Sequence, residues 1–439
     1  MEGGKEAYVE ALKSEQVQHH IEFFRKTDDA REQGLVNHIP LTLLAAAYLG
    51  APVADLRPFL GGKYERFLQN FGAELVPPIT GDTPGETGKE KPEAVAAVLR
   101  LAKEHPGSRG MVSVAEKLEA EAREHGIQRV VNVYLRHVLL HGSTFANVFH
   151  SILLVAFPFE LETMGVTQAD AEELMRPLVC SGLAMTLTKA TNALCFGPLV
   201  SASARAEPLT AVAMEAAMEA ARADPGLTAL WDDLKTAAGG KPMLLFNFTP
   251  YWSAAQTDAA RRWQHVYARH LDLCGAFRTA EATQATLGVL AAVALRYYTI
   301  GQGFLAVHIV SAIRALHLLA RVVADAAVYE ECCRHVWRQA TFLMITLELD
   351  AKRQGMGGVA RARGERGESE VTPEELHPDP LPEWAALCRQ ATDTNASHTI
   401  KLVYAVYALA RHHTAHPDAA RIDRDARHSA AIAVACRIN

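Results

Sequence analysis

Four of the nineteen histidines occur in apolar or constrained segments rather than among charged residues. His38 lies in NHIPLTLLAAAYLG, His150 in FANVFHSILLVAFPF, His308 in GFLAVHIVSAIRAL and His398 in SHTIKLVYAVYALA. A buried imidazole needs a partner, so any one of the four is explained most simply as a core histidine that hydrogen-bonds to a carbonyl. Four on separate apolar segments make a shared metal ion an equally strong interpretation, because neutral imidazole is a common ligand for iron, zinc, copper and nickel.

A lysine follows the last of these histidines in a segment that is otherwise uncharged. From His398 to Ala410, Lys401 is the only residue with a formal charge. In a helix, a spacing of three residues leaves two side chains about 60° apart, so His398 and Lys401 share a face. The other faces are apolar too, which is typical of a buried helix. Burial would push the amine toward its neutral form.

The elements that must position these residues are predicted to be helices. Ala-rich segments with helical periodicity dominate the chain, for example PEAVAAVLRLAKEH and TQATLGVLAAVALRYY. KPMLLFNF, residues 241–248, is the one run that resembles a strand. In the segment of His38, we expect Asn37 as the N-cap, Pro40 in the first turn and Gly50 at the end of the helix. The sequence therefore predicts an all-α protein.

We expect one large helical domain over residues 1–439, with the metal site in the core of the helices. Two stretches rich in proline, glycine and charge, near 76–93 and 351–383, are predicted to be long loops. The unusual histidines lie on both sides of the second stretch, which favours one domain with an insertion over two domains. The remaining histidines, as in QHHIEFF, ARHHTAHPD and RDARHSAA, lie near charges or chain ends and are interpreted as surface residues.

The composition excludes several classes of protein. A formal charge of −6 and a pI near 6.3 argue against nucleic acid as a partner. Seven cysteines without a C-x-x-C pair favour a reduced, intracellular protein, and the charged N-terminus shows no secretory signal. The uncharged run 138–159 contains Asn147, two histidines and Pro158, so we interpret it as protein core rather than a membrane span. We expect a soluble, cytoplasmic protein without a membrane partner; the oligomeric state is not indicated.

The four histidine segments together resemble the questin oxidase-like family, whose fungal members act in anthraquinone and related polyketide pathways. NHIP followed by LGAP is similar to the NH motif of that family, and HGSTFANVFHSILLVAFPFELE is similar to its FH motif. GFLAVHIVSAIRAL resembles its H-x-[VL]-[TS] helix, and SHTIKLVYA its H-x-x-K-[LT] motif. The resemblance covers about residues 33–410 in short motifs. Leu41 stands where many fungal members have a second histidine, and residues 165–300 match poorly, so the substrate is not implied.

The resemblance implies a metal site with four histidines and a modified lysine. Carried over to this chain, the ligands are His38, His150, His308 and His398, with Lys401 carboxylated by CO₂ and assigned a catalytic role as well. The carbamate is chemically a carboxylate on a long stem, so the site would combine imidazoles with one anionic oxygen. That set is loosely related to the two-histidine, one-carboxylate irons that activate O₂.

The function implied is that of a non-haem iron oxygenase. Fe(II), or another divalent metal, would use O₂ for oxidative ring cleavage or Baeyer–Villiger-like oxidation of a small aromatic or quinone substrate of the polyketide type. No G-x-G-x-x-G follows a predicted strand, so NADPH is expected only as a reductant. Two alternatives stay open: a hydrolase with a zinc-bound water, and a non-enzymatic helical protein in which Lys401 extends to solvent.

Groups that orient the metal ligands are also expected. A ligating imidazole usually donates its second N–H to a carboxylate or a carbonyl. Candidates near the proposed ligands in sequence are Asn37, Asn147, Glu160 and Asp393. His141 lies in the same uncharged run as His150 and is the expected substitute if one ligand is misassigned.

Overall fold

The structure is a computed structural model. It describes residues 7–13, 22–26, 32–36, 38–52, 92–105, 108–140, 149–188, 209–237, 262, 265–271, 280–299, 303–353, 380–394, 396–416 and 419–436. The helices of the first half are α2 (Ile39–Tyr48), α5 (Pro92–Glu104), α6 (Ser108–His125), α7 (Ile127–Leu140), α8 (His150–Ala156), η2 (Phe157–Phe159), α9 (Glu160–Thr163) and α10 (Gln168–Thr188). Those of the second half are α11 (Ala211–Arg222), α12 (Pro225–Ala237), η5 (Tyr267–Leu271), α14 (Ala280–Thr299), α15 (Gly303–Leu319), α16 (Ala326–Arg353), α19 (Trp384–Asp393), α20 (Ser397–His412) and α21 (Ala419–Cys436).

The fold is all-α, as predicted, with one small addition. Strands β1 (Glu22–Lys26) and β2 (Glu32–Val36) form an antiparallel pair in which Glu22 lies opposite Val36. The sequence did not predict this pair, because neither EFFRK nor EQGLV alternates between apolar and polar residues. The strand-like run 241–248 lies outside the described residues.

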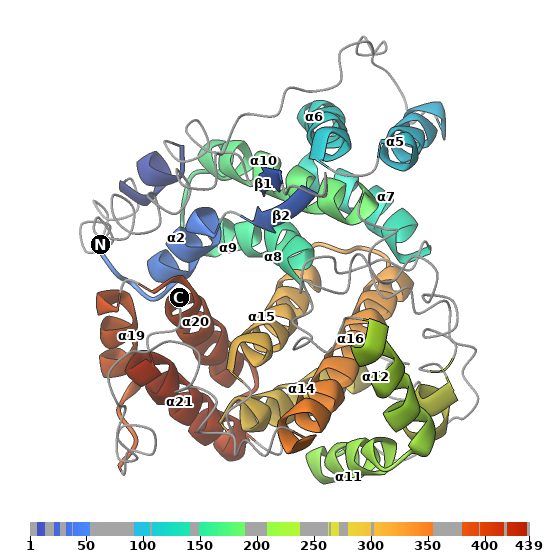
Figure 1. Cartoon of the computed structure of the whole chain (residues 1–439). Coiled ribbons are helices and arrows are strands. Elements are labelled where there is room, and N and C mark those ends of the chain that lie inside the picture. Colours follow the sequence, from blue (N-terminus) through green and yellow to red (C-terminus); the bar gives the residue numbers. More distant parts are fainter. Residues whose placement is uncertain are drawn as a thin grey trace.

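Buried apolar side chains form one continuous core that takes in residues from Tyr8 to Ala433. Helix α20 packs against α2, α15, α19 and α21, and α15 packs against α8, α14, α16 and α20 (Figure 1). Helices α15 and α20 therefore contact elements from the N-terminal, middle and C-terminal parts of the chain. A single core of this kind favours one domain over two.

A close approach of two helices near the middle of the core depends on Gly182 in α10. A Cβ at this position would lie 2.8 Å from the Ser151 carbonyl oxygen and 2.8 Å from Val155 Cγ2, both in α8. Real Cβ atoms do not come so near to backbone oxygen. Glycine thus allows α10 to pack directly on α8, the helix that begins with His150.

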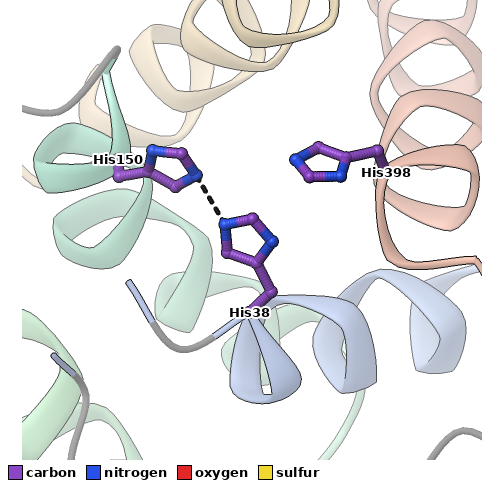
Figure 2. Close-up of side chains that lie close together, drawn as sticks. All are labelled: His38, His150 and His398. Carbon is purple, nitrogen blue, oxygen red and sulfur yellow. Dashed lines mark hydrogen bonds between the residues drawn. The ribbon is translucent and has the colours of Figure 1, made fainter. Parts of the chain in front are cut away.

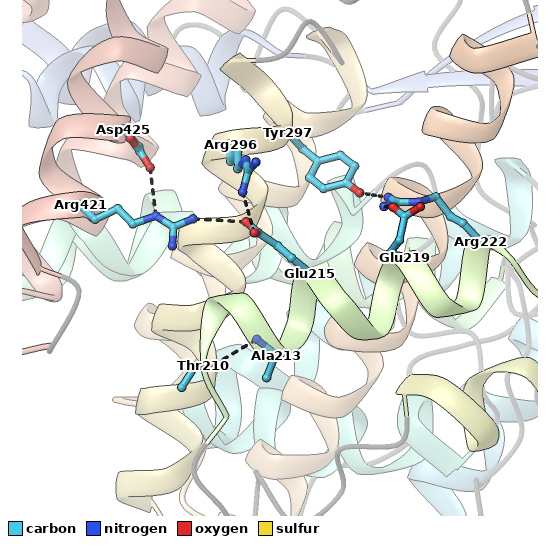
Figure 3. A network of polar contacts seen from close by, with 9 residues as sticks. All are labelled: Thr210, Ala213, Glu215, Glu219, Arg222, Arg296, Tyr297, Arg421 and Asp425. Carbon is cyan, nitrogen blue, oxygen red and sulfur yellow. Dashed lines mark hydrogen bonds and ion pairs between the residues drawn. The ribbon is translucent and has the colours of Figure 1, made fainter.

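Polar contacts tie α11 to its neighbours on the other side of the molecule (Figure 3). Glu215 accepts hydrogen bonds from Arg296 of α14 at 2.6 Å and from Arg421 of α21 at 3.2 Å. The Thr210 hydroxyl caps the start of α11 by accepting from the Ala213 N–H at 3.1 Å. Partly exposed ion pairs of this kind add little stability.

The predicted loops lie mostly outside the described residues. Helix α16 continues to Arg353, so the first three residues of the predicted 351–383 loop are helical instead. Helix α5 begins at Pro92, within the predicted 76–93 loop. In the described part of the chain, no helix combines the length and the apolar character needed to cross a membrane.

Candidate metal centre

His38 begins helix α2 and is its N-cap, where we had expected Asn37. Pro40 occupies the first turn, where its missing N–H has no helical partner to lose, and Gly50 follows the helix with a φ of +78°. The His38 side chain forms no capping hydrogen bond. Its ring is therefore directed to other contacts. Asn37 itself lies outside the described residues.

His150 is the first residue of α8, and the residue before it has an unusual backbone. Phe149 has a φ of 67° and is the one non-glycine residue with positive φ in the described ranges. A bulky residue rarely adopts this left-handed conformation, which is disfavoured by about 1–3 kcal/mol and is found preferentially at functional sites. The Phe149 side chain is buried, so packing stabilises the turn that directly precedes His150.

His398 lies in the first turn of α20, and a hydrogen bond ties this turn to α2. The hydroxyls of Thr42 and Ser397 lie 2.8 Å apart, and Thr42 also donates to the His38 carbonyl at 2.7 Å. Both hydroxyl side chains are buried. The starts of α2 and α20 are thereby held side by side, although 355 residues separate the two bonded residues in sequence.

The four predicted histidines lie together in the interior. His38 Nε2 and His150 Nε2 are 2.8 Å apart, and each ligand nitrogen of His38, His150 and His398 lies within 4.8 Å of the other two (Figure 2). The rings follow one another in a closed circuit. Neighbouring centroids are 4.8 Å apart for His38 and His150, 4.7 Å for His150 and His308, 5.3 Å for His308 and His398, and 4.7 Å for His398 and His38.

Lys401 belongs to the same buried region. Only 2% of the residue is exposed, and its Nζ has no hydrogen-bond partner among the residues that the structure describes. Burial lowers the pKa of this amine from 10.5 to about 7. The idea that Lys401 extends to solvent is therefore wrong.

The electrostatics of the cluster disfavour protonated imidazole. The pKa of His38 is held well below 6.5, first by removal of the ring from solvent and then by the positive charges that Lys401 and the other three histidines would carry. Neutral imidazoles keep a lone pair on one nitrogen, which is the form that binds a metal. The cluster thus offers neutral nitrogen donors around a common point.

Glu160 has a different role from the one expected. It accepts hydrogen bonds from Arg314 Nε at 3.0 Å and from the Tyr404 hydroxyl at 2.5 Å, and Arg314 Nη2 also contacts it. The partners of its carboxylate are thus Arg314, Tyr404 and Thr163, not a histidine. Asp393 is exposed, unlike the cluster, and Asn147 and His141 lie outside the described residues.

The group around Glu160 links the same parts of the chain that carry the cluster. Arg314 is in α15 with His308, Tyr404 is in α20 with His398, and Glu160 follows directly on the α8–η2 segment that His150 begins. Tyr48, at the end of α2, packs edge-on against Tyr404 with ring centroids 5.0 Å apart, and the Arg314 guanidinium lies 5.7 Å from the centre of its ring. We refer to Tyr48, Glu160, Arg314 and Tyr404 as the clamp. One feature of the sequence indicates the clamp: Arg314 is the only Lys, Arg, Asp or Glu in α15.

Comparisons with known protein families, with curated proteins and with solved structures found no match to this chain. The structural argument for a function therefore rests on the geometry of the side chains.

Proposed function

We propose that this protein is a metal-dependent oxygenase, with Fe(II) held by His38, His150, His308, His398 and a carboxylated Lys401. The observation that carries the proposal is the convergence of three imidazole nitrogens within 4.8 Å of one another, with the fourth ring adjacent. These histidines come from four separate helices, so chance proximity along one helix does not explain the cluster.

The donor set fits a transition metal. His38 Nε2 and His150 Nε2 face each other at 2.8 Å, where two lone pairs would repel unless a proton or a cation lies between them. Imidazole nitrogen suits iron, zinc, copper and nickel, whereas magnesium and calcium prefer oxygen. A divalent transition metal would satisfy these nitrogens together.

Lys401 fits the site better as a carbamate than as an ammonium. An ammonium beside a dication would be repelled, whereas the neutral amine can react with CO₂. In that reaction the lysine nitrogen forms a bond to the carbon of CO₂, one N–H proton is released, and the side chain becomes an anionic N-carboxylate. The burial that disfavours the ammonium supports this assignment.

When bound, the metal would supply activation of O₂ next to an electron-rich aromatic or quinone substrate. The residues of the chain would hold that metal at fixed geometry, exclude bulk water through the surrounding core, and keep the imidazoles neutral. The clamp would keep the ligand-bearing helices in register. The net outcome would be oxidative ring cleavage or a Baeyer–Villiger-like oxidation, with NADPH serving only as a reductant.

Zinc is the metal of the second candidate function, a hydrolase. Three histidines with an open position also describe a catalytic zinc site that activates water. The resemblance of the four histidine segments to the questin oxidase-like family is the reason to prefer iron and O₂.

Metal analysis and oxygen uptake test the two candidates. Protein prepared without a histidine tag should contain close to one equivalent of iron, and should consume O₂ with hydroxylated anthraquinones or quinols under air. His150→Ala and His398→Ala should lose both properties, while His105→Ala, at an exposed position after α5, should keep them. Stoichiometric zinc with unchanged turnover in anaerobic buffer would support the hydrolase instead. Tag-free protein without any bound metal would refute both.

The carboxylated lysine is tested separately. Reconstitution with Fe(II) in CO₂-depleted buffer should give low activity, and added bicarbonate should restore it. Lys401→Ala should be inactive with or without bicarbonate. If Lys401→Ala retains full activity and metal content, only the four histidines remain as ligands.

A further inference from the structure

A second group of histidines is packed together at the other ends of helices α15 and α20. It consists of His317 in α15, His412 and His413 at the end of α20, and His416 in the turn that follows. We call these four residues the distal histidine cluster. Sequence had suggested surface positions for the ARHHTAHPD residues, but only 5% of His413 is exposed. His317 is 2% exposed.

The rings of the distal histidine cluster are in direct contact. Centroids lie 3.8 Å apart for His317 and His412, 4.8 Å for His317 and His413, 5.1 Å for His412 and His413, and 5.9 Å for His413 and His416. Along α15, His317 is nine residues from His308, a rise of about 13 Å. The distal cluster is therefore separate from the candidate metal centre.

Buried nitrogens in this cluster lack ordinary partners. Neither Nδ1 nor Nε2 of His317 has a hydrogen-bond partner among the described residues, and the same holds for His413 Nε2. A buried polar atom left in this way is disfavoured by about 1–3 kcal/mol. A cation that accepts nitrogen lone pairs would remove the penalty.

Two neighbours from α14 fit a ligand role for these histidines. Gln284 Oε1 lies 3.2 Å from His412 Nε2, so this nitrogen can donate to the amide and leave Nδ1 with its lone pair. Gly288 provides room, because a Cβ there would come within 2.8 Å of His416 Nε2 and 3.3 Å of His413 Nδ1. Glycine inside a helix is less favourable than alanine by about 1 kcal/mol, so the space it leaves for the histidines accounts for its presence.

We propose that His317, His412 and His413, with His416 beside them, form a second site for a divalent transition-metal ion of the zinc, copper or nickel type. The donors are all imidazole nitrogens, which favours these ions over magnesium and calcium. The rings are available in neutral form, since burial holds the pKa of His317 well below 6.5 and lowers that of His413 to about 3.

Binding at the distal cluster requires a small movement of the rings. His317 and His412 are stacked at an interplanar angle of 20°, and their lone pairs must tilt toward a common point to share an ion. His412 is exposed at the end of its helix and can make this adjustment. We therefore expect weaker binding than at the candidate metal centre, whose nitrogens already converge.

The test uses Zn²⁺ as the probe and a full-length protein in which the first site is removed. His150→Ala/His398→Ala protein, prepared without a tag, should bind one Zn²⁺ in isothermal titration calorimetry. Adding His317→Phe or His412→Ala should weaken this binding at least 10-fold. Adding His105→Ala, which removes an exposed histidine at the end of another helix, should leave it unchanged.

Each outcome decides the proposal. His412 is exposed, so the His412→Ala protein should fold, and its circular dichroism should match that of the parent. The absence of Zn²⁺ binding in the first-site double variant overturns the proposal, as does unchanged affinity in either distal variant. Co²⁺ provides a second readout, because a site of three or four nitrogens should give visible absorption bands that disappear in His317→Phe. These measurements do not depend on the proposed oxygenase activity.

Discussion

Lys401 is expected to lower the stability of the metal-free protein. Its amine is buried without a hydrogen-bond partner among the described residues, so the folded state without metal gains nothing from its polarity. Methionine has a similar length and no charge. We expect Lys401→Met to raise the free energy of unfolding of the metal-free protein by about 1–3 kcal/mol, while metal affinity falls.

Urea denaturation in the presence of a chelator measures this effect. Lys103→Met provides the control, because Lys103 is exposed in α5 and its replacement should change stability by less than about 0.5 kcal/mol. If the metal-free Lys401→Met protein is less stable than the metal-free wild type, the Lys401 amine has a stabilising polar partner in solution.

Glu160 is the residue on which the clamp depends. Replacing it with glutamine leaves the Arg314 guanidinium buried opposite a neutral amide, and loss of one partner of a buried ion pair lowers stability by about 3–5 kcal/mol. We expect Glu160→Gln to lower the free energy of unfolding by about 3 kcal/mol and to weaken metal binding, because the ligand-bearing helices lose their common contact. Thermal denaturation and metal titration measure the two effects.

An exposed ion pair gives the comparison for Glu160. Asp233 pairs with Arg262 at 2.5 Å but is largely exposed, so Asp233→Asn should change stability by less than about 1 kcal/mol. The double variant Glu160→Gln/Arg314→Met should recover part of the lost stability. If it is no more stable than Glu160→Gln alone, the buried charge is not the cause.

At the scale of elements, α15 and α20 run parallel and share a row of polar side chains that extends from the buried core to the exposed end of α20. His308 meets His398, Arg314 meets Tyr404, and His317 meets His412, so sequence increases in the same direction along both helices. Each contact lies one or two turns from the next. The candidate metal centre, the clamp and the distal histidine cluster thus lie at three successive positions along the α15–α20 pair.

The close contact between α8 and α10 predicts that one added methyl group at Gly182 destabilises the protein. Gly182→Ala would push α8 away at Ser151, the residue after His150, since the nearest atom is backbone oxygen that cannot rotate aside. We expect a loss of about 1–3 kcal/mol in the free energy of unfolding and a measurable loss of metal affinity. Ala169→Leu adds a larger group on an exposed position of α10 and should do neither. Unchanged metal affinity in Gly182→Ala would show that His150 is positioned independently of α10.

Helix α16 carries an acid-sensitive contact that is independent of both histidine clusters. Burial tends to raise the pKa of Glu331, but its hydrogen bond to His335 and the nearby arginines outweigh burial and lower the pKa from 4.5 to about 2. The carboxylate therefore stabilises the fold fully above pH 4.5, and this contribution is lost as the pH falls from 4.5 to about 2. The difference in unfolding free energy between the wild type and Glu331→Gln should shrink over that range. A constant difference would mean that Glu331 acts through its shape alone.

At the scale of the whole molecule, a bound metal should stabilise the protein by linkage. An ion bound only by the folded state adds about 4 kcal/mol when its concentration is 1,000 times the dissociation constant. We expect Fe(II) or Co²⁺ to raise the melting temperature of the wild type under anaerobic conditions, and to raise that of His150→Ala much less. Equal shifts in the two proteins would place the stabilising ion elsewhere.

Sequence alone predicted the all-α fold and the residues of the four-ring cluster, because polar residues in apolar helices are visible without a structure. The prediction that Glu160 orients a histidine ligand was wrong. Its partners Arg314 and Tyr404 lie 154 and 244 residues away in sequence, and no neighbouring residue indicates them. His413 was assigned to the surface because its neighbours in sequence are polar. Its burial comes from packing between helices distant in sequence, which composition does not report.

The bond between Thr42 and Ser397 has a consequence for how the protein is made. A ribosome synthesises the His38 segment early and the His398 segment near the end, so most of the chain must emerge before the two can meet. A nascent chain that ends before α20 therefore cannot bring all four imidazoles together. If the cluster binds a metal as proposed, loading of the ion follows synthesis of α20. A ribosome that stalls before α20 releases a polypeptide that contains His38, His150 and His308 but lacks His398 and Lys401.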